Sequence, residues 1–327
     1  MANIAEIAAA AGVSTATVSR AINTPEKVRP ETLRRIQETI QQFNYAPVNN
    51  RRIRSDHTTR TILVVMDDFS NIFLIDVLSG INKSALKNGY SLLLFATNSL
   101  PDRERETIKL LNNHQADGVI LLSSHLDDDD LNQIYTSHPM VQCCEYSDTC
   151  DLPHVSIDNK AAYMEAIEFL IKLGYTDIAL LSSNNGLIST TLREAAYFES
   201  MRKFHLSPSP KWFRRNSDSF YGGYESMQAI LRQGNLPRAV LCNTDTSAAG
   251  AIRAIHEAGL RVPQDIAVMG TDNLEICNMI TPTLTTTAQP RKRIGQLAVE
   301  MLIRQIIGEK DQESLFLPHE LIVRNST

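Results

Sequence analysis

From Thr61 onward, short β-rich runs alternate with helical stretches, and this alternation constrains the fold more than any other feature of the chain. Strands that alternate with helices form parallel sheets with helices on both faces. The pattern over 61–327 therefore predicts an α/β body of two doubly wound parallel-sheet lobes with a crevice between them. The expected strands are Thr61–Met66, Ser91–Ala96, Gly118–Ser123, Met140–Glu145, Val155–Asp158, Ile178–Ser183, Ala239–Cys242 and Ile266–Gly270. The clearest helical patterns are Tyr163–Leu173 and Ala248–Ala258.

The first 47 residues have a different pattern, which predicts a small all-α head of three short helices. Apolar residues recur at helical spacing from Ile4 to Ala11, and Gly12 ends this segment. Ser14 is placed to cap a second helix, Thr15–Asn23, and a third begins near Pro30. Two short helices joined by a tight glycine-containing turn are typical of a helix-turn-helix, although an ordinary helical hairpin has the same spacing.

The charge of the chain is divided unevenly between these two parts. Residues 1–60 hold nine basic and five acidic side chains, a net charge of +4, whereas the whole chain carries −5. A basic head on an acidic body indicates that the head is the part that approaches a polyanion. Residues 48–60 contain four arginines and no hydrophobic period, as expected of a linker that lies against phosphates.

Several protein classes conflict with the sequence. Apolar runs such as Ile62–Met66 are far shorter than a bilayer span, and Met1–Ala11 lacks the basic start of a secretory signal. The five cysteines have no C-x-x-C spacing, so we expect reduced thiols, no metal site, no cofactor and a cytoplasmic location. The lack of a signal peptide argues against a transport receptor. A sugar-acting enzyme fails because the chain has no phosphate-binding glycine motif and no catalytic constellation.

Several segments carry a resemblance to a known family. They are Val13–Asn23, Tyr45–Pro47, Gly270–Asn273, Leu284–Pro290 and Glu320–Thr327. The first segment looks like the helix-turn-helix signature of the LacI/GalR transcriptional regulators, and the resemblance covers essentially the full chain. It implies a homodimeric, effector-controlled DNA-binding regulator with a body like the periplasmic sugar-binding proteins. The tail of the chain is mildly similar to the nucleoside-responsive members.

The DNA-reading residues are expected on the second helix. A recognition helix enters the major groove with its N-terminus first, which places Thr15 and Ala16 at base edges, with Arg20 one turn later. Arg20 can form a bidentate pair with guanine. By resemblance these three read bases, and the residues expected to fix the register on phosphates are Ser14, Thr17, Ser19 and Asn23.

The linker departs from the family pattern. Members commonly carry Ala-Arg-x-Leu, whose leucine wedges into the minor groove, but here Arg54 stands where that leucine is expected. Ile53 is an apolar candidate one position early, and Arg51 and Arg52 precede it. We therefore expect electrostatic attachment to the minor groove rather than a kinking wedge.

The effector is expected in the crevice, at polar residues that follow the strands. Carboxylates accept hydrogen bonds from ligand hydroxyls, and a guanidinium donates to the same diol. By resemblance Arg193 and Asp272 bind hydroxyls, and Phe73 and Phe220 form the apolar wall. Further candidates are Asp158, Asn184, Thr244 and Asp245, of which Asp158 and Asp245 have the alternative role of helix N-caps. A nucleoside, a sugar and a sugar phosphate all remain open.

Together these observations predict a regulator, expected to be a repressor, that binds a near-palindromic operator as a homodimer. Effector binding would shift the lobes and change the spacing of the heads, and release of DNA is the commoner outcome in the family. The expected domains are 1–47 for the head, 48–60 for the linker and 61–327 for effector binding and dimerisation. Within the last, one lobe is expected at about 61–159 and 291–320, and the other at about 160–290.

Overall fold

The computed structural model describes residues 4–23, 27–43, 58–207, 209–309 and 313–327. The chain divides into two compact units, Met1–Thr58 and Thr59–Thr327, here called the head and the body. The predicted limits of the linker stay predictions, because most of it lies outside the described residues.

The head is a three-helix unit, as the sequence predicts. Its helices are α1 (Ile4–Ala10), α2 (Thr15–Asn23) and α3 (Pro30–Gln42). Gly12 has φ +63°, a conformation that favours glycine, and so turns the chain from α1 toward α2. Ile7, Val18 and Ile36, one from each helix, are fully buried together. Helical spacing places these apolar side chains on the inner faces of the three helices.

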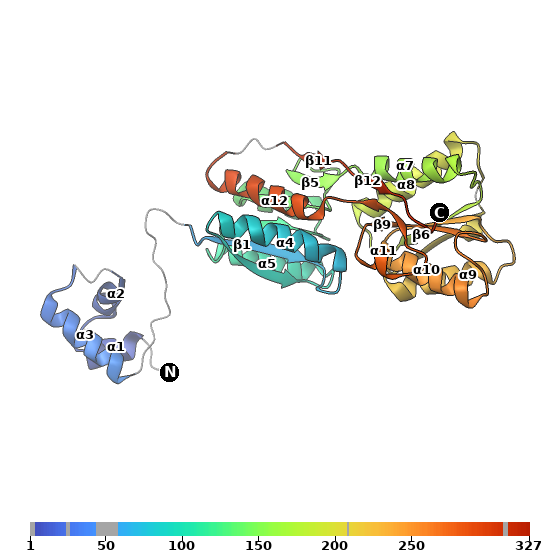
Figure 1. The fold of residues 1–327 in the computed structure, drawn as a ribbon. Coiled ribbons are helices and arrows are strands. Elements are labelled where there is room, and N and C mark those ends of the chain that lie inside the picture. Colours follow the sequence, from blue (N-terminus) through green and yellow to red (C-terminus); the bar gives the residue numbers. More distant parts are fainter. Residues whose placement is uncertain (1–3, 24–26, 44–57, 208, 310–312) are drawn as a thin grey trace. The chain divides into compact units, whose positions relative to one another are not determined.

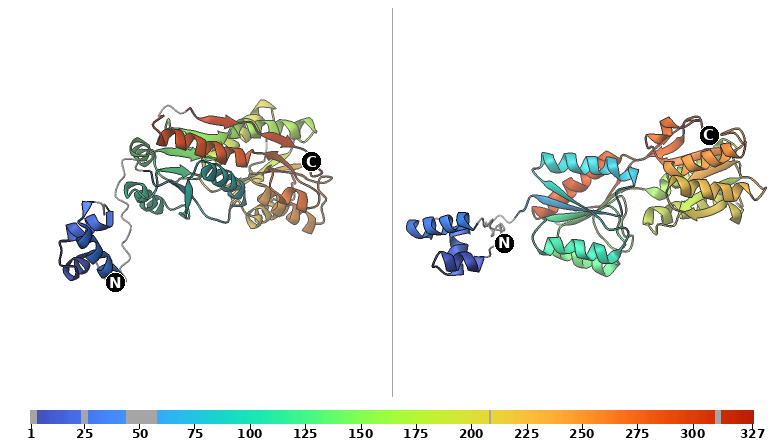
Figure 2. Two further views of the ribbon diagram at one scale, coloured as in Figure 1. Left: turned by 60° about the vertical axis from the view of Figure 1, so that its left-hand side comes forward. Right: turned by 90° about the horizontal axis from the view of Figure 1, so that it is seen from below.

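The first lobe of the body is built on a six-stranded parallel sheet in the order β11-β5-β4-β3-β1-β2. The strands are β1 (Thr61–Met66), β2 (Ser91–Ala96), β3 (Gly118–Leu121), β4 (Met140–Cys143), β5 (His154–Ile157) and β11 (Leu315–Leu317). Its helices are α4 (Ile72–Lys87), α5 (Pro101–Asn112), α6 (Asp128–Ser137) and α12 (Arg291–Ile306). They cover both faces of the sheet (Figure 2).

The second lobe repeats this plan, with the strand order β12-β10-β9-β8-β6-β7. All of its pairings are parallel except that of β10 with β12. The strands are β6 (Ile178–Ser183), β7 (Phe213–Asn216), β8 (Ala239–Cys242), β9 (Ala267–Asp272), β10 (Thr285–Ala288) and β12 (Glu320–Ile322). The helices are α7 (Asn159–Lys172), α8 (Ile188–Lys203), α9 (Phe220–Leu231), α10 (Asp245–Glu257) and the short α11 (Ile276–Met279), with a 3₁₀ turn at Pro210–Trp212.

The two-residue period of the strands explains the layers. Along β1, Ile62 and Val64 pack toward α4 and α12, whereas Leu63 and Val65 pack toward α5 and α6. Strands buried on both faces read as continuous apolar runs, which is why β1 could be found from the sequence.

The chain passes between the lobes three times, after β5, after β10 and between β11 and β12 (Figure 1). The lobes are therefore joined by three connections rather than one, an arrangement suited to a hinged movement about a cleft.

Some strands differ from their predicted limits. β9 extends to Asp272, so this residue ends a strand instead of following one. β7, β10, β11 and β12 were not predicted. β10 consists mostly of buried threonines, of which Thr285 and Thr286 have hydrogen-bonded hydroxyls, and so it lacks the apolar signal of a core strand.

In the first lobe α4 and α12 approach each other at glycines. A Cβ atom built on Gly295 would lie 2.2 Å from the carbonyl oxygen of Val77, and one on Gly80 would lie 2.1 Å from that of Lys292. Both obstacles are backbone atoms, so the helices would have to separate to admit a side chain.

We predict that Gly295→Ala destabilises the body by about 1–3 kcal/mol, the usual cost of overpacking. Alanine gains about 1 kcal/mol of helix propensity over glycine, but a contact of 2.2 Å with backbone outweighs this gain. Urea unfolding measures the effect. Arg304→Ala, at an exposed position of the same helix, serves as control and should change stability by less than about 0.5 kcal/mol. Equal stability of Gly295→Ala and wild type would contradict the packing argument.

Candidate functional site

In the head, α2 presents a polar surface at its N-terminal end. Thr15, Ala16 and Arg20 are exposed, whereas Val18 and Ala21 face the core of the head. Ser14 accepts a hydrogen bond from the backbone N–H of Thr17 at 3.2 Å, as expected of the N-cap. Its hydroxyl also lies 2.8 Å from that of Thr17. The first turn of α2 is thus fixed by its own side chains, with the predicted base-reading residues on the outside.

Other predicted DNA contacts are described less completely. Ser19 is half-buried on α2, and Asn23 is the last residue of this helix. The predicted linker contacts, Arg51, Arg52, Ile53 and Arg54, lie outside the described residues.

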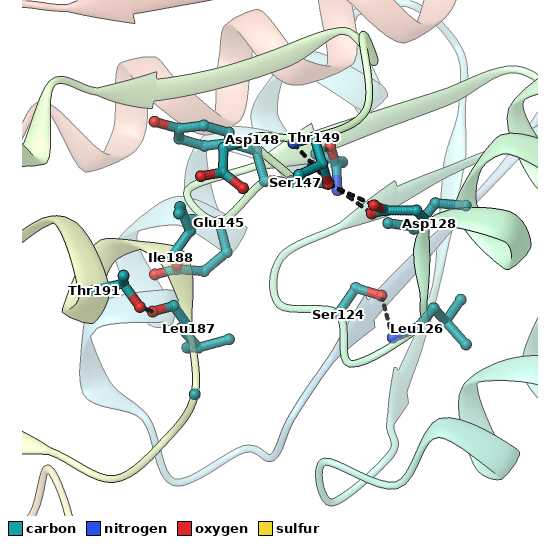
Figure 3. A pocket seen from close by; sticks show the side chains of 14 residues that line it. Ser124, Leu126, Asp128, Glu145, Ser147, Asp148, Thr149, Leu187, Ile188 and Thr191 are labelled. Atoms are coloured by element: carbon teal, nitrogen blue, oxygen red, sulfur yellow. Dashed lines mark hydrogen bonds between the residues drawn. The ribbon is translucent and has the colours of Figure 1, made fainter.

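In the body, a cavity of about 350 Å³ opens between segments of the two lobes (Figure 3). This is within the range of small-molecule sites. The first lobe contributes the segment from Ser124 to Leu131 and the segment from Gln142 to Thr149, and the second contributes residues 186–191 at the start of α8. Parallel strands end toward this region, as expected for an α/β ligand site.

Arg193 of α8 is buried, and neither it nor any other predicted effector residue is among the residues that line this cavity. Its Nε donates to Asn159 Oδ1 at 3.0 Å, and its Nη1 donates to the backbone carbonyl of Asn243 at 2.9 Å. The guanidinium also lies over the ring of Tyr163, 5.4 Å from its centroid. These contacts orient the side chain and replace part of its lost hydration. Burial lowers the pKa of Arg193, but Tyr163 and the carboxyl groups of Asp272, Glu145 and Asp218 raise it above its ordinary value.

Asp272, the second residue predicted to bind ligand hydroxyls, is 3% exposed. Its Oδ1 accepts from Gln289 Nε2 at 2.7 Å, and its backbone carbonyl accepts from Arg291. Its φ of 110° lies in the region that favours glycine, a strain of roughly 1–3 kcal/mol that the surrounding contacts must hold. Burial raises the pKa of Asp272, and the Arg193 charge opposes this rise. Strain and a perturbed carboxyl group at one buried position make Asp272 a candidate for a functional role.

Arg291 connects Asp272 to the other lobe. It stands at the start of α12, and its Nη2 forms an ion pair of 2.7 Å with Asp76 Oδ2 on α4. The same guanidinium donates to the Asp272 carbonyl. Arg291 therefore contacts both Asp272 in the second lobe and α4 in the first. Asp76 has a lowered pKa because Arg291 donates to it.

Sequence reasoning missed Glu145, which bridges the lobes. Glu145 follows β4 in the first lobe, and its Oε2 accepts from the backbone N–H of Ser189 in α8 at 3.0 Å. Burial raises its pKa, against the lowering effect of Ser189 and Arg193. Glu145 lies two positions beyond the end of β4, but the predicted strand Met140–Glu145 includes it, so it is absent from the polar residues expected to follow strands.

A second contact between the lobes was also missed. His125 Nε2 lies 3.4 Å from the carbonyl oxygen of Asn185, while its Nδ1 lies 3.6 Å from carboxylate oxygens of Asp67 and Glu104. Glu104 and Asp67 raise the pKa of His125, and burial raises that of Asp67. Glu104 is fully buried on α5 and accepts from Ser124 Oγ at 2.7 Å.

The remaining predicted effector residues have visible local roles. Asp158 is exposed and caps α7 by accepting from Ala161 N–H at 2.9 Å, and Thr244 caps α10 through a capping box with Ser247. Asp245 is buried and accepts from Leu274 N–H and Thr286 Oγ1, both at 2.6 Å. Asn184 is exposed.

The predicted aromatic wall is half-buried. Phe73 packs against the core of the first lobe, and Phe220 begins α9. Next to Phe220, Asp218 accepts from Asn243 Nδ2 and from Asn185 Nδ2, both at 2.9 Å. Asn243 therefore contacts both Arg193 and Asp218 and links them.

Over the described ranges, no helix is long and apolar enough to cross a membrane, and no group of three His, Cys, Asp or Glu side chains could hold a metal ion.

Comparison with known proteins adds an independent finding. The model of bacterial regulatory proteins of the lacI family matches residues 3–48, and that of a periplasmic binding protein-like domain matches residues 167–327. The HTH-type transcriptional repressor CytR of Escherichia coli K12 is 32% identical over 328 residues, which cover 100% of this chain and 96% of that protein. The HTH-type transcriptional repressor PurR of Vibrio campbellii is 31% identical over 337 residues, which cover 100% and 98%.

Solved structures agree. The lac repressor dimer bound to operator and the anti-inducer ONPF has a TM-score of 0.78 at 26% identity, with 99% of this chain and 98% of that chain covered. The complex of the transcriptional regulator CelR with cellobiose has a TM-score of 0.76 at 25% identity, with both chains covered completely.

The raised pKa of Asp272 predicts how the stability of the body depends on pH. The folded state holds the carboxyl proton more tightly than the unfolded state, so stability falls as pH rises above the ordinary carboxyl value of about 4 toward the raised value. We predict that Asp272→Asn, which keeps the acceptor for Gln289, reduces this decline between pH 5 and 8.

Urea unfolding at several pH values measures the decline. Asp129→Asn, at an exposed position of α6, is the control and should follow wild type. Parallel pH profiles for Asp272→Asn and wild type would show that Asp272 does not titrate in this window.

Proposed function

Because this chain belongs to the LacI family of bacterial regulatory proteins, we propose how its head, linker and cleft divide the work of an effector-controlled repressor. The chain is a DNA-binding transcriptional regulator and not an enzyme. The head binds an operator, and a small molecule in the cleft changes the affinity of the head for that operator. The protein acts in the cytoplasm, where chromosomal DNA is accessible.

The head reads DNA through the N-terminal end of α2. Thr15 and Ala16 meet base edges in the major groove, with Arg20 one turn further along. A guanidinium at this position can donate two hydrogen bonds to guanine. Ser14, Thr17, Ser19 and Asn23 hold the register on phosphates, and the arginines of the linker add electrostatic attachment.

The effector binds between the lobes, and the observation that carries this proposal is the buried Arg193 with carboxylates from both lobes around it. Asp272 and Asp218 belong to the second lobe and Glu145 to the first. A buried charge with several ionisable neighbours is an arrangement typical of functional sites, and this supports a ligand site at Arg193. A hydroxyl-bearing ligand can donate to Asp272 and accept from Arg193.

The effector acts through the contacts that join the lobes. The contacts of Glu145 with Ser189, of His125 with Asn185, and of Arg291 with the Asp272 carbonyl all change when the lobes move. An effector shifts the operator affinity only by its differential affinity for the two lobe arrangements, typically about 1–3 kcal/mol of coupling. Release of DNA by the effector makes the protein an inducible repressor.

The protein acts as a homodimer, joined through the face of the first lobe next to β2. This strand is at the edge of its sheet, with Leu94 and Phe95 exposed on it, and Ile72 and Ile75 are exposed in the first turn of α4. An edge strand beside exposed apolar side chains is suited to pairing with a second copy. The related lac repressor structure is itself a dimer on its operator.

Binding selection from genomic fragments tests the function as a whole. The full-length protein should enrich discrete, near-palindromic sites, and an effector of the cleft should weaken that binding. Failure to enrich any discrete site would contradict the proposal.

For the head, we predict that Arg20→Ala costs about 1–3 kcal/mol on the selected operator and relaxes specificity at one base position, because a bidentate contact with a base is lost. Gel shifts with single-base operator variants measure both effects. Arg34→Ala on α3, which removes an exposed ion pair with Glu38, should leave the base preference unchanged. A uniform loss on all operator variants would instead assign Arg20 to a phosphate.

For the dimer, we predict that Ile75→Asp yields folded monomers at micromolar concentration and weakens operator binding, because a charge is placed in an apolar interface. Light scattering after gel filtration measures the mass. Tyr221→Asp, in the exposed first turn of α9, should remain dimeric. A dimeric Ile75→Asp protein would place the interface elsewhere.

A further inference from the structure

Three effector classes remain compatible with the residue types in the cleft, namely sugars, sugar phosphates and nucleosides. The charges of the residues that line the cavity distinguish between these effector classes. Of its described lining residues, Asp128, Glu145 and Asp148 are acidic, and none is Lys, Arg or His. The others are apolar or uncharged polar residues.

Helix N-termini are the usual alternative to basic residues for holding a phosphate. Two helices, α8 and α6, begin at this cavity, and acids of the chain itself already occupy both N-termini. At α8, the N–H of Ser189 donates to Glu145 Oε2 at 3.0 Å. At α6, the N–H of Asp130 donates to Asp127 Oδ1 at 2.9 Å, and the first turn adds Asp128, Asp129 and Asp130.

Arg193 does not line this cavity, and its charge is matched by the groups around it. The Arg193 guanidinium donates to Asn159 and Asn243, and the carboxylates of Asp272, Glu145 and Asp218 surround it. Arg291 is paired with Asp76. A phosphate dianion in this cavity would therefore be repelled by Asp128, Glu145 and Asp148, of which Asp128 and Asp148 are exposed and partly screened by water.

On the basis of the proposed function, we infer that the effector is an unphosphorylated, donor-rich small molecule, and that Glu145 excludes phosphorylated compounds by occupying the N-terminus of α8. Carboxylates accept hydrogen bonds and donate none when ionised, so the ligand supplies the O–H or N–H groups. Free sugars, amino sugars and nucleosides satisfy this requirement, and sugar phosphates and nucleotides do not. Repulsion of the wrong ligand thus contributes to specificity alongside attraction of the right one.

Matched pairs of compounds test the inference on the full-length protein. The panel contains the common nucleosides with their 5′-monophosphates, glucose and ribose with their terminal phosphates, and glucosamine beside glucose. Thermal shift identifies binders, and calorimetry gives the dissociation constants. The parent compound should bind at least tenfold more tightly than its phosphorylated partner.

Glu145→Gln tests the residue itself, because the amide oxygen can still accept from Ser189 N–H while the charge is removed. The preference for the unphosphorylated partner should shrink by about tenfold or more, because removal of a like unit charge about 12 Å away changes binding by that factor at an effective dielectric constant near 20. Asp129→Asn, in the same acidic first turn of α6 but outside the cavity lining, should keep the wild-type preference.

The outcomes separate the two levels of the proposal. Tighter binding of a phosphorylated compound to wild type overturns the inference and leaves the effector-controlled repressor intact. An unchanged preference in Glu145→Gln overturns the role of Glu145. Absence of binding by every compound of the panel contradicts the proposed effector site, and the inference falls with it.

Discussion

The body of this protein is organised around the buried positive charge of Arg193. A guanidinium loses several kcal/mol of hydration on burial, and the surrounding groups must replace it. Here the replacement comes from amide and carbonyl groups of Asn159 and Asn243, from the face of Tyr163, and from carboxylates at a longer range. These groups lie on elements that follow different strands, so the charge ties the ends of several strands to one point. A ligand that reaches this point competes for interactions that hold the cleft together.

In the proposed mechanism, contacts of the same region communicate effector binding. Asp272 is held with a positive φ, and Arg291 donates to its carbonyl while pairing with Asp76 on α4. α4 and α12 meet through Gly80 and Gly295 with backbone in direct contact, so neither helix can move far without the other. A close-packed pair of this kind transmits a shift rather than absorbing it. The first turn of α4 also carries the exposed apolar residues assigned to the dimer interface, so effector site and dimer face share a helix.

Many helices and strands could be predicted because the sequence patterns that specify them are local. Helical spacing and the Gly12 turn gave the head its correct helices, and continuous apolar runs gave strands such as Thr61–Met66 and Ile178–Ser183 with their observed limits. The unpredicted strands lack such signals. β7 is a partly exposed edge strand, β10 buries threonines through hydrogen bonds, and β11 and β12 are short strands of three residues whose pairing partners lie far away in the sequence.

The residues of the candidate site also divide into those that the sequence identifies and those that it does not. Arg193 and Asp272 could be named from the sequence through their resemblance to family positions, and the structure brings both into one buried network. Glu145, His125 and Asp218 could not be identified from the sequence. Their roles depend on which segments face each other across the cleft, and no local sequence pattern encodes this pairing of segments. The sequence by itself determined many of the elements, the two-lobed plan and the family, since periodicity and short motifs are local properties. Only the tertiary structure decided which carboxylate lies at the start of α8 and how the charges balance, since both depend on distances between residues remote in the chain.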